Sequence, residues 1–304
     1  MATVSDTFER KEKKYLITAE QCRAIKEALA LRMELDDYGA SRIDSLYLDT
    51  PDRSLICRSL EKPIYKEKLR IRSYGAFSEA GKVFVEIKKK FKGIVYKRRV
   101  AMSSAGAQAF YSGELSYEEA CERFPIAGAD PTNSLTPGKV QIAREIEAFL
   151  NRYDGLAPSM LISCMREAWR PIDPEDEDCV DRITFDEDIC YVDLMQDSAV
   201  QRCRVTGPDQ VVMEVKCAGG YPAWLCELFS EVGAYPRSFS KYGNAYKRVL
   251  AGQGAIDIRD SDSGKVSIHR IPTARERVGK HSGSLISPSA GYELATPLTF
   301  ARAS

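Results

Sequence analysis

The chain has 304 residues, of which 44% are hydrophobic, a composition typical of a folded protein. No apolar run approaches the length that crosses a bilayer, and the first residues show neither an apolar core nor a cleavage site. These features argue against an integral membrane protein and against a signal peptide. They predict a cytoplasmic protein without a membrane span.

Charge is balanced over the whole chain, with 44 basic and 44 acidic residues, but it is unevenly distributed. Residues 62–99 contain thirteen lysines and arginines and three acids, Glu67, Glu79 and Glu86. A neutral chain with one strongly basic block predicts a local anion site rather than a general attraction to polyanions.

Cysteine and histidine give no sign of a soft metal site. The nine cysteines are scattered without a C-x-x-C pair, and both histidines, His269 and His281, lie in a polar C-terminal segment. This pattern argues against a zinc site. It also argues against nucleophilic catalysis by a Ser-His or Cys-His pair.

The first half of the chain alternates apolar and polar residues, which predicts strands. The predicted strands are 8–17, 43–49, 65–74, 83–89 and 94–102. Thr18 is the expected N-cap of a helix over 19–31, and 50–52 form a turn. Residues 75–81 and 92–93 are expected to connect hairpins.

The second half mixes helices with further strands. Helices are predicted at 104–124, 140–153, 223–232 and 242–251, and strands at 159–169, 182–189, 201–204 and 211–216. From residue 252 onward the chain is polar and has no lasting periodicity. The sequence therefore predicts one α+β domain of residues 1–251, followed by a disordered or loosely docked tail of residues 252–304.

The predicted strands carry their cations on one face. Residues two apart share a face of a strand, so Lys66, Lys68, Arg70 and Arg72 lie opposite Leu69 and Ile71. For a single strand, the simplest interpretation is a solvated face of an antiparallel sheet. Lysine and arginine nevertheless dominate strand after strand, and like charges on neighbouring strands repel one another. A bound polyanion explains the repetition better than solvation does.

Two glutamates, Glu12 and Glu214, stand among these cations. Each carboxylate could hold a hard divalent cation that bridges to phosphate oxygens. Each could equally form an ion pair with an adjacent lysine, and the sequence leaves both interpretations open.

Nine short motifs then occur in a fixed order along the chain. They are R-x-E-x-K-Y (10–15), S-L-Y-L-D-T (45–50), K-L-R-I-R-S-Y-G (68–75), V-F-V-E-I-K (83–88), Y-K-R-R (96–99), M-R-E-A-W (165–169), R-I-T-F-D (182–186), M-E-V-K (213–216) and F-S-K-Y (239–242). With these motifs, residues 8–250 resemble the VTC (vacuolar transporter chaperone) domain. That domain is the polyphosphate polymerase branch of the CYTH-like triphosphate tunnel metalloenzymes.

The resemblance implies a fold and a set of site residues. The implied fold is an antiparallel β-barrel enclosing a basic tunnel, with flanking helices. Cations at the matching positions would hold the transferring phosphates: Arg70, Arg72, Lys88, Lys97 and Lys216. Further substrate contacts would come from Arg10, Lys14, Lys68, Arg99, Arg166, Arg182 and Lys241. Glu214, assisted by Glu12, would hold manganese or magnesium (Mn²⁺ or Mg²⁺).

The implied reaction moves the γ-phosphate of ATP onto a growing polyphosphate chain and releases ADP. The acceptor oxygen is already ionised, so no strong general base is needed. A triphosphatase remains an alternative, with Glu12 or Glu86 orienting water, and so does a non-catalytic polyphosphate-binding module. Nucleic acid is disfavoured because the basic faces lack interleaved aromatic residues. The oligomeric state stays open.

Two departures from the family pattern stand out. Ser238 occupies the place of a second basic residue before F-S-K, with Arg237 one position earlier, which leaves one phosphate contact in doubt. The chain also shows no SPX phosphate-sensing domain and no membrane helices. The resemblance is therefore to the standalone bacterial type.

Overall fold

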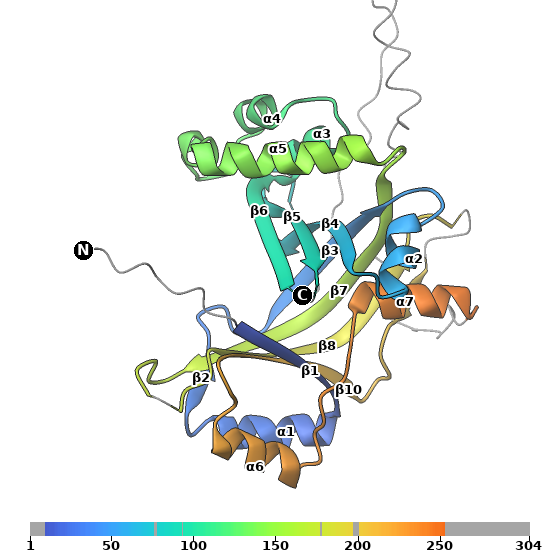
Figure 1. Ribbon diagram of the computed structural model, residues 1–304. Coiled ribbons are helices and arrows are strands. Elements are labelled where there is room, and N and C mark those ends of the chain that lie inside the picture. Colours follow the sequence, from blue (N-terminus) through green and yellow to red (C-terminus); the bar gives the residue numbers. More distant parts are fainter. Residues whose placement is uncertain (1–9, 76–77, 93, 177, 197–200, 253–304) are drawn as a thin grey trace, which may run out of the picture. The chain divides into compact units, whose positions relative to one another are not determined.

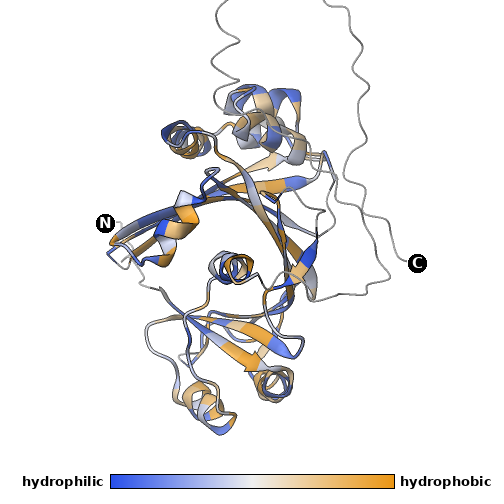
Figure 2. Cartoon of the chain, turned by 90° about the vertical axis from the view of Figure 1, so that its right-hand side faces the viewer, coloured by the Kyte–Doolittle hydropathy of each residue, from blue (hydrophilic) through white to orange (hydrophobic). Residues whose placement is uncertain are grey.

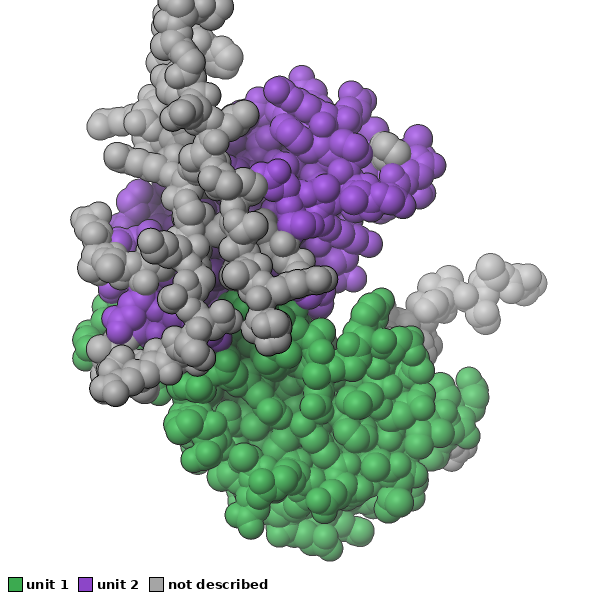
Figure 3. Space-filling model, turned by 180° about the vertical axis from the view of Figure 1, so that it is seen from behind, with its two compact units in different colours: residues 1–43, 163–191, 204–253 green, residues 44–162, 192–203, 254–304 purple. Residues whose placement is uncertain are grey.

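The computed structural model describes residues 10–75, 78–92, 94–176, 178–196 and 201–252 (Figure 1). The chain divides into two compact units, which Figure 3 colours separately. Unit 1 comprises Met1–Ile43, Ser163–Tyr191 and Arg204–Gln253, and unit 2 comprises Asp44–Ile162, Val192–Cys203 and Gly254–Ser304.

Ten strands form one sheet. They are β1 (Arg10–Thr18), β2 (Met33–Leu35), β3 (Ser41–Asp49), β4 (Tyr65–Tyr74), β5 (Lys82–Phe91), β6 (Ile94–Ser103), β7 (Ala157–Pro171), β8 (Arg182–Asp193), β9 (Arg202–Arg204) and β10 (Gln210–Ala218). The strand order is β1-β10-β8-β7-β3-β4-β5-β6, with β2 on β7 and β9 on β8. Among the described strands, β1 and β6 end this order without pairing to each other, so the hydrogen-bonded path is open.

The helices are α1 (Ala19–Leu29), α2 (Ser54–Leu60), α3 (Ser104–Tyr111), α4 (Tyr117–Arg123), α5 (Pro137–Arg152), α6 (Ala223–Glu231) and α7 (Lys241–Leu250), with a 3₁₀ turn at Pro131–Ser134. The prediction of an α+β fold, in which an antiparallel sheet is flanked by helices, is confirmed. None of the described helices is long and apolar enough to cross a bilayer.

In unit 1, α1 and α6 cover one side of β1 and β10 (Figure 1). The side chains of Ile17, Phe185 and Met213 point to these helices and are buried with Ile25 and Leu225. Thr18 caps α1 as predicted: its hydroxyl accepts from the Gln21 backbone, and the Gln21 side chain accepts from the Thr18 backbone. Because side chains alternate, the even-numbered residues of β1, β8 and β10 lie on the opposite face of the sheet.

In unit 2, α3, α4 and α5 cover the apolar face of β4, β5 and β6 (Figure 1). Leu69, Val85 and Val100 are fully buried there against Tyr117 and Phe149. In Figure 2 the strands carry both hydrophilic and hydrophobic residues, as strands with one buried face do. The lysines and arginines of β4 to β6 are therefore directed away from the helices.

A buried carboxylate joins α5 to the sheet of unit 2. Glu67 on β4 accepts hydrogen bonds from the Tyr65 hydroxyl (2.6 Å), the Arg152 guanidinium (2.9 Å) and the Tyr153 hydroxyl (2.7 Å). Arg152 and Tyr153 form the C-terminal end of α5. Glu67 thus anchors that end of the helix on the back of the cationic strand.

Most predicted elements occur within a few residues of their expected bounds, with three differences. The predicted helix 104–124 is two helices, α3 and α4, and the short elements α2 and β2 were not predicted. Residues 8–9 of the first predicted strand and the tail from residue 253 lie outside the described part of the chain.

Candidate functional site

Unit 2 presents a grid of side chains on β4, β5 and β6, which we call the cationic face. The register aligns three rows: Lys68, Lys88 and Lys97; Arg70, Glu86 and Arg99; Arg72, Phe84 and Ala101. Nine neighbouring positions therefore hold six cations and one carboxylate. Like charges this close repel one another, so an anion bound among them would stabilise the face.

Glu86 lies at the centre of the grid and is 1% exposed. Its Oε2 accepts from Arg70 Nε at 2.7 Å, and Arg70 Nη2 lies 2.6 Å from the same oxygen. Its Oε1 lies 2.9 Å from Lys97 Nζ and 3.7 Å from Arg99 Nη1. Burial alone would raise the pKa of Glu86, but Arg70 and Lys97 lower it to about 2. Glu86 is therefore a charged anchor that fixes the positions of three cations.

Strand β3 supplies two hydroxyl groups to the same face. Arg70 Nη1 donates to the Tyr47 hydroxyl at 3.3 Å, and Arg72 Nε donates to Ser45 Oγ at 3.2 Å. Burial would raise the pKa of Tyr47, yet the charges of Arg70, Arg72 and Lys68 lower it to about 8. A buried tyrosine whose pKa falls below its ordinary value reports a strongly positive local potential.

The same positive potential affects the pKa of Lys68. Its pKa is lowered to about 8, chiefly by burial and also by the charges of Lys66 and Lys88, against the opposing effects of Tyr47 and Asp49. Burial likewise lowers the pKa of Lys97, although Glu86 opposes it. These lysines keep their charge more easily when an anion lies among them.

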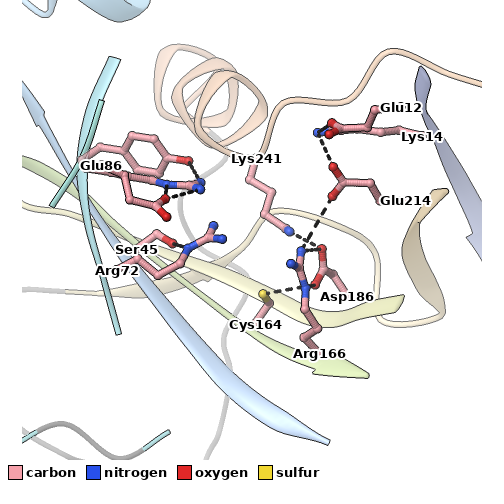
Figure 4. A network of polar contacts seen from close by, with 12 residues as sticks. Glu12, Lys14, Ser45, Arg72, Glu86, Cys164, Arg166, Asp186, Glu214 and Lys241 are labelled. Carbon is pink, nitrogen blue, oxygen red and sulfur yellow. Dashed lines mark hydrogen bonds and ion pairs between the residues drawn. The ribbon is translucent and has the colours of Figure 1, made fainter. Parts of the chain in front are cut away.

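In unit 1 a second buried carboxylate, Asp186 on β8, also gathers cations (Figure 4). Arg166 binds it with both Nε (2.6 Å) and Nη2 (2.7 Å), Lys241 forms an ion pair with Oδ2, and Cys164 Sγ lies 3.7 Å from Oδ1. Burial would raise the pKa of Asp186, but the charges of Lys241 and Arg166 hold it well below its usual range. Asp186 fixes Arg166 and Lys241 as Glu86 fixes the cations of unit 2.

Glu214 lies beside this cluster and beside Glu12 (Figure 4). Lys14 Nζ is 3.9 Å from Glu214 and 3.6 Å from Glu12, and Arg166 Nη2 is 3.8 Å from Glu214. Burial would raise the pKa of Glu214, but Lys14, a hydrogen bond with Glu12, and the charges of Lys216 and Arg166 lower it. Lys14 lies within 4 Å of both carboxylates and so offsets the repulsion between them.

The donor set of Glu12 and Glu214 suits a hard divalent ion, because both ligands are carboxylate oxygens. Across the described ranges of the chain, no group of three or more histidine, cysteine, aspartate or glutamate side chains could hold a metal. The chain therefore offers two carboxylates, and the remaining ligands would come from a bound phosphate or from water.

Three further predicted residues lie on or near this face of unit 1. Lys216 is opposite both Glu12 and Arg182 in the sheet register. Arg182 Nη2 forms an ion pair with Asp36 at 2.5 Å. Of Arg10 the structure describes the backbone alone, opposite Ala218.

The predicted site residues thus fall into two groups. The cationic face of unit 2 holds Lys68, Arg70, Arg72, Lys88, Lys97 and Arg99; the cluster of unit 1 holds Glu12, Lys14, Arg166, Arg182, Glu214, Lys216 and Lys241. In unit 1 the cations already lie beside Glu12, Glu214, Asp186 or Asp36, whereas in unit 2 six cations surround Glu86.

Sequence reasoning missed three residues of these groups, and it gave a fourth, Glu86, a different role, that of orienting water. Asp186 and Glu86 act as buried anchors, and Ser45 and Tyr47 contact the arginines of β4. All four stand inside the motifs R-I-T-F-D, V-F-V-E-I-K and S-L-Y-L-D-T. Their alternation with apolar residues was a usable signal, because it places them on the same faces as the cations.

A family model described as the VTC domain matches residues 9–250. The chain belongs to the VTC domain family. The match covers both units, and it supports a function related to polyphosphate or triphosphate.

The similarities between this chain and solved structures are weaker. The Hippeastrum protein HpAC1, described as having a dominant triphosphatase activity, is 13% identical with a TM-score of 0.42, over 78% of this chain and 94% of that one. The PH1819 protein of Pyrococcus horikoshii OT3 is 15% identical with a TM-score of 0.37, over 80% and 99%. A candidate adenylate cyclase of Vibrio parahaemolyticus is 11% identical with a TM-score of 0.34, over 80% and 97%. No curated protein matches the chain in sequence.

Proposed function

We propose that this VTC domain protein is a metal-dependent phosphotransferase that moves the γ-phosphate of ATP onto a polyphosphate chain. The observation that carries the proposal is the grid of unit 2, where six cations surround Glu86. A triphosphate or polyphosphate supplies closely spaced negative charges along a line, which matches rows of cations on adjacent strands.

The chemistry asks for alignment and charge neutralisation rather than for a nucleophile on the protein. Arg70 and Arg72 offer planar forks for phosphate oxygens, and Lys88, Lys97 and Lys216 offer mobile point charges. Because Glu86 is ionised and engaged by Arg70 and Lys97, it is poorly placed to activate water. Because Glu86 is held in these ion pairs, transfer to an ionised phosphate oxygen is favoured over hydrolysis.

Glu12 and Glu214 would hold the divalent ion, manganese or magnesium. When bound, the ion would offset negative charge on the phosphate oxygens. Lys14 and Arg166, which lie within 4 Å of Glu214, would keep its carboxylate ionised and oriented.

The test is to incubate the protein with ATP and Mn²⁺ and to resolve the products on a gel. Long phosphate chains together with ADP support the polymerase. Free phosphate alone would identify a triphosphatase, and polyphosphate binding with intact ATP would identify a binding module.

Matched variants locate the reaction on the cationic face. Arg70→Ala, Arg72→Ala and Lys88→Ala are expected to abolish turnover while the protein still folds. Arg98→Gln is the control, because Arg98 lies on β6 next to Lys97 but points to the other face, where it pairs with Glu145 at 3.5 Å. Equal activity in all four variants would refute the assignment.

A further inference from the structure

The end of the β5–β6 hairpin exposes an unusual set of apolar side chains, which we call the tip patch. Ile64, just before β4, is 69% exposed, and Ile94 and Tyr96 on β6 are 56% and 54% exposed. Phe91 and Val95 are also exposed. Large apolar side chains that are exposed together at one end of a hairpin indicate an interaction surface.

The tip patch is one continuous part of unit 2. Lys92 N donates to Ile64 O at 3.0 Å, which ties the hairpin end to the segment before β4. The register places Tyr65, Phe91 and Ile94 side by side on three adjacent strands. The neighbouring strand β6 ends the strand order, so its outer edge has no partner among the described strands.

Lysines are also concentrated at this end of the hairpin. Residues 61–66 and 89–97 contain six lysines and a single acid, Glu61. Five of these lysines belong to none of the phosphate-binding positions above: Lys62, Lys66, Lys89, Lys90 and Lys92. Lys62 and Lys90 lie close enough to Lys66 that their charges, together with its burial, lower the pKa of Lys66. The tip patch therefore combines exposed apolar side chains with a concentrated positive charge.

We propose that the tip patch docks the protein reversibly on an anionic lipid bilayer. Ile64, Phe91, Ile94 and Tyr96 would enter the headgroup region, and the lysines would lie against the acidic headgroups. This inference is independent of the phosphotransferase proposal, because it uses different side chains and needs no turnover.

Other binding partners would contact only one part of the tip patch, either its lysines or its apolar side chains. A free polyphosphate or a nucleic acid would engage the lysines but would leave the apolar side chains in water. A second copy of the chain would cover the apolar side chains but would bring two sets of lysines together. An anionic bilayer would bury the apolar side chains and would pair the lysines with acidic headgroups at the same time.

The experiment is co-sedimentation of the full chain with vesicles of phosphatidylcholine, with and without phosphatidylserine. Binding is expected only with phosphatidylserine, and it should weaken as salt is raised. The triple variant Lys62→Gln/Lys90→Gln/Lys92→Gln should lose roughly five-fold in partitioning for each lysine. The double variant Phe91→Ser/Ile94→Ser should lose binding that salt removal does not restore.

Controls come from exposed residues of the same types in unit 1. Arg23→Gln/Lys247→Gln and Leu31→Ser/Leu250→Ser should bind vesicles as the unaltered chain does. Thermal unfolding and product formation in solution should be unchanged in every variant, which separates docking from folding and from the proposed reaction.

Several outcomes would overturn the inference. They are equal binding to neutral and anionic vesicles, tip variants that bind as the unaltered chain does, or a dimer in solution that the tip variants dissolve. Binding of soluble polyphosphate or RNA that is lost in the triple variant, without vesicle binding, would assign the lysines to a free polyanion instead.

Discussion

At the scale of single residues, one buried carboxylate organises the cations in each unit. Glu86 holds Arg70 and Lys97, and Asp186 holds Arg166 and Lys241. Buried carboxylates of this kind add little net stability, because desolvation offsets much of the attraction. Their effect is to hold long, flexible cations at fixed positions before a ligand arrives.

Glu86→Gln tests this anchoring. Removing the carboxylate leaves the partly buried Arg70 guanidinium without its counter-charge and takes an ion pair from the more exposed Lys97, so the free energy of unfolding should fall by about 1–3 kcal/mol. Urea unfolding measures the change. Glu145→Gln is the control, because Glu145 is 27% exposed where Glu86 is 1% exposed, so its pairs with Lys89 and Arg98 should contribute less, about 1 kcal/mol. Similar losses in both variants would contradict an anchoring role for Glu86.

Anion binding should depend on pH through Lys68 and Tyr47. Lys68, whose pKa is lowered to about 8, loses its positive charge as the pH rises through that value. Tyr47, whose pKa is also lowered to about 8, gains a negative charge over the same range. Both changes oppose anion binding, so affinity is retained below pH 8 and lost above it.

Titration calorimetry with tripolyphosphate measures this dependence. From about pH 7 to about pH 9, affinity should fall by roughly ten-fold for each of the two groups. Tyr47→Phe and Lys68→Met should each flatten the profile. A profile that neither substitution changes would show that other groups titrate.

Glu214 and Glu12 should control the metal requirement. Glu214→Gln removes an anionic oxygen ligand, so Mn²⁺ binding in the presence of tripolyphosphate should weaken by at least about ten-fold. Manganese electron paramagnetic resonance reports the bound ion without any turnover. Glu187→Gln, on the same strand as Asp186 but paired with Lys26 at 3.1 Å, is the control. Unchanged Mn²⁺ affinity in Glu214→Gln would remove this residue from the metal site.

At the scale of elements, the strands of the cationic face were predictable and α2 was not. The alternation of polar and apolar residues predicted β4 with its observed bounds, because lysines and arginines lie on one face of the strand and mainly apolar residues on the other. In α2, a seven-residue helix begins after Arg53 without a side-chain cap from that residue. The cap comes instead from Asp49 at the end of β3, whose carboxylate accepts from the Leu55 and Ile56 backbone at 2.9 and 3.0 Å. Asp49 lies six residues before Leu55, too far upstream to be recognised in the sequence as the N-cap of a helix.

Asp49→Ala should therefore destabilise α2. The substitution leaves three buried N–H groups without an acceptor, those of Thr50, Leu55 and Ile56. We expect a loss of about 2–3 kcal/mol in the free energy of unfolding and faster amide hydrogen exchange in Ser54–Leu60. Asp52→Ala, an exposed substitution in the same turn, should have a smaller effect. Unaltered exchange in α2 would show that other contacts hold it.

At the scale of the whole molecule, the sequence predicted one basic tunnel lined by these cations, but neither their division between the two units nor the contacts inside each group. Strand periodicity predicts which face of a strand carries Arg166, Glu214 and Asp186. Which side chains lie next to them depends on the register between strands, and the sequence of a single strand does not determine that register. Lys241 is the clearest case, since it reaches Asp186 from the first residue of α7. The domain of residues 1–251 stays a prediction, and the structure divides the described chain into two compact units.

The whole protein should be more stable with a polyanion bound. Tripolyphosphate at roughly a hundred-fold excess over its Kd should add about 3 kcal/mol to the free energy of unfolding and raise the Tm. Lys68→Met should raise the Tm without ligand, because it relieves repulsion with Lys66 and Lys88, and it should shrink the shift that the ligand causes. Differential scanning calorimetry separates the two effects. A ligand shift of full size in Lys68→Met would place the anion elsewhere.

The division of the chain has a practical consequence for dissecting the protein. Unit 1 is assembled from three separate stretches, and unit 2 interrupts it twice. Four strands, β3, β7, β8 and β9, each contain residues of both units. No single gene fragment can encode either unit intact, and any cut between them severs a strand rather than a linker. Proteolysis or truncation at these boundaries should therefore yield aggregation instead of a smaller folded piece, and neither unit should fold when it is expressed without the other.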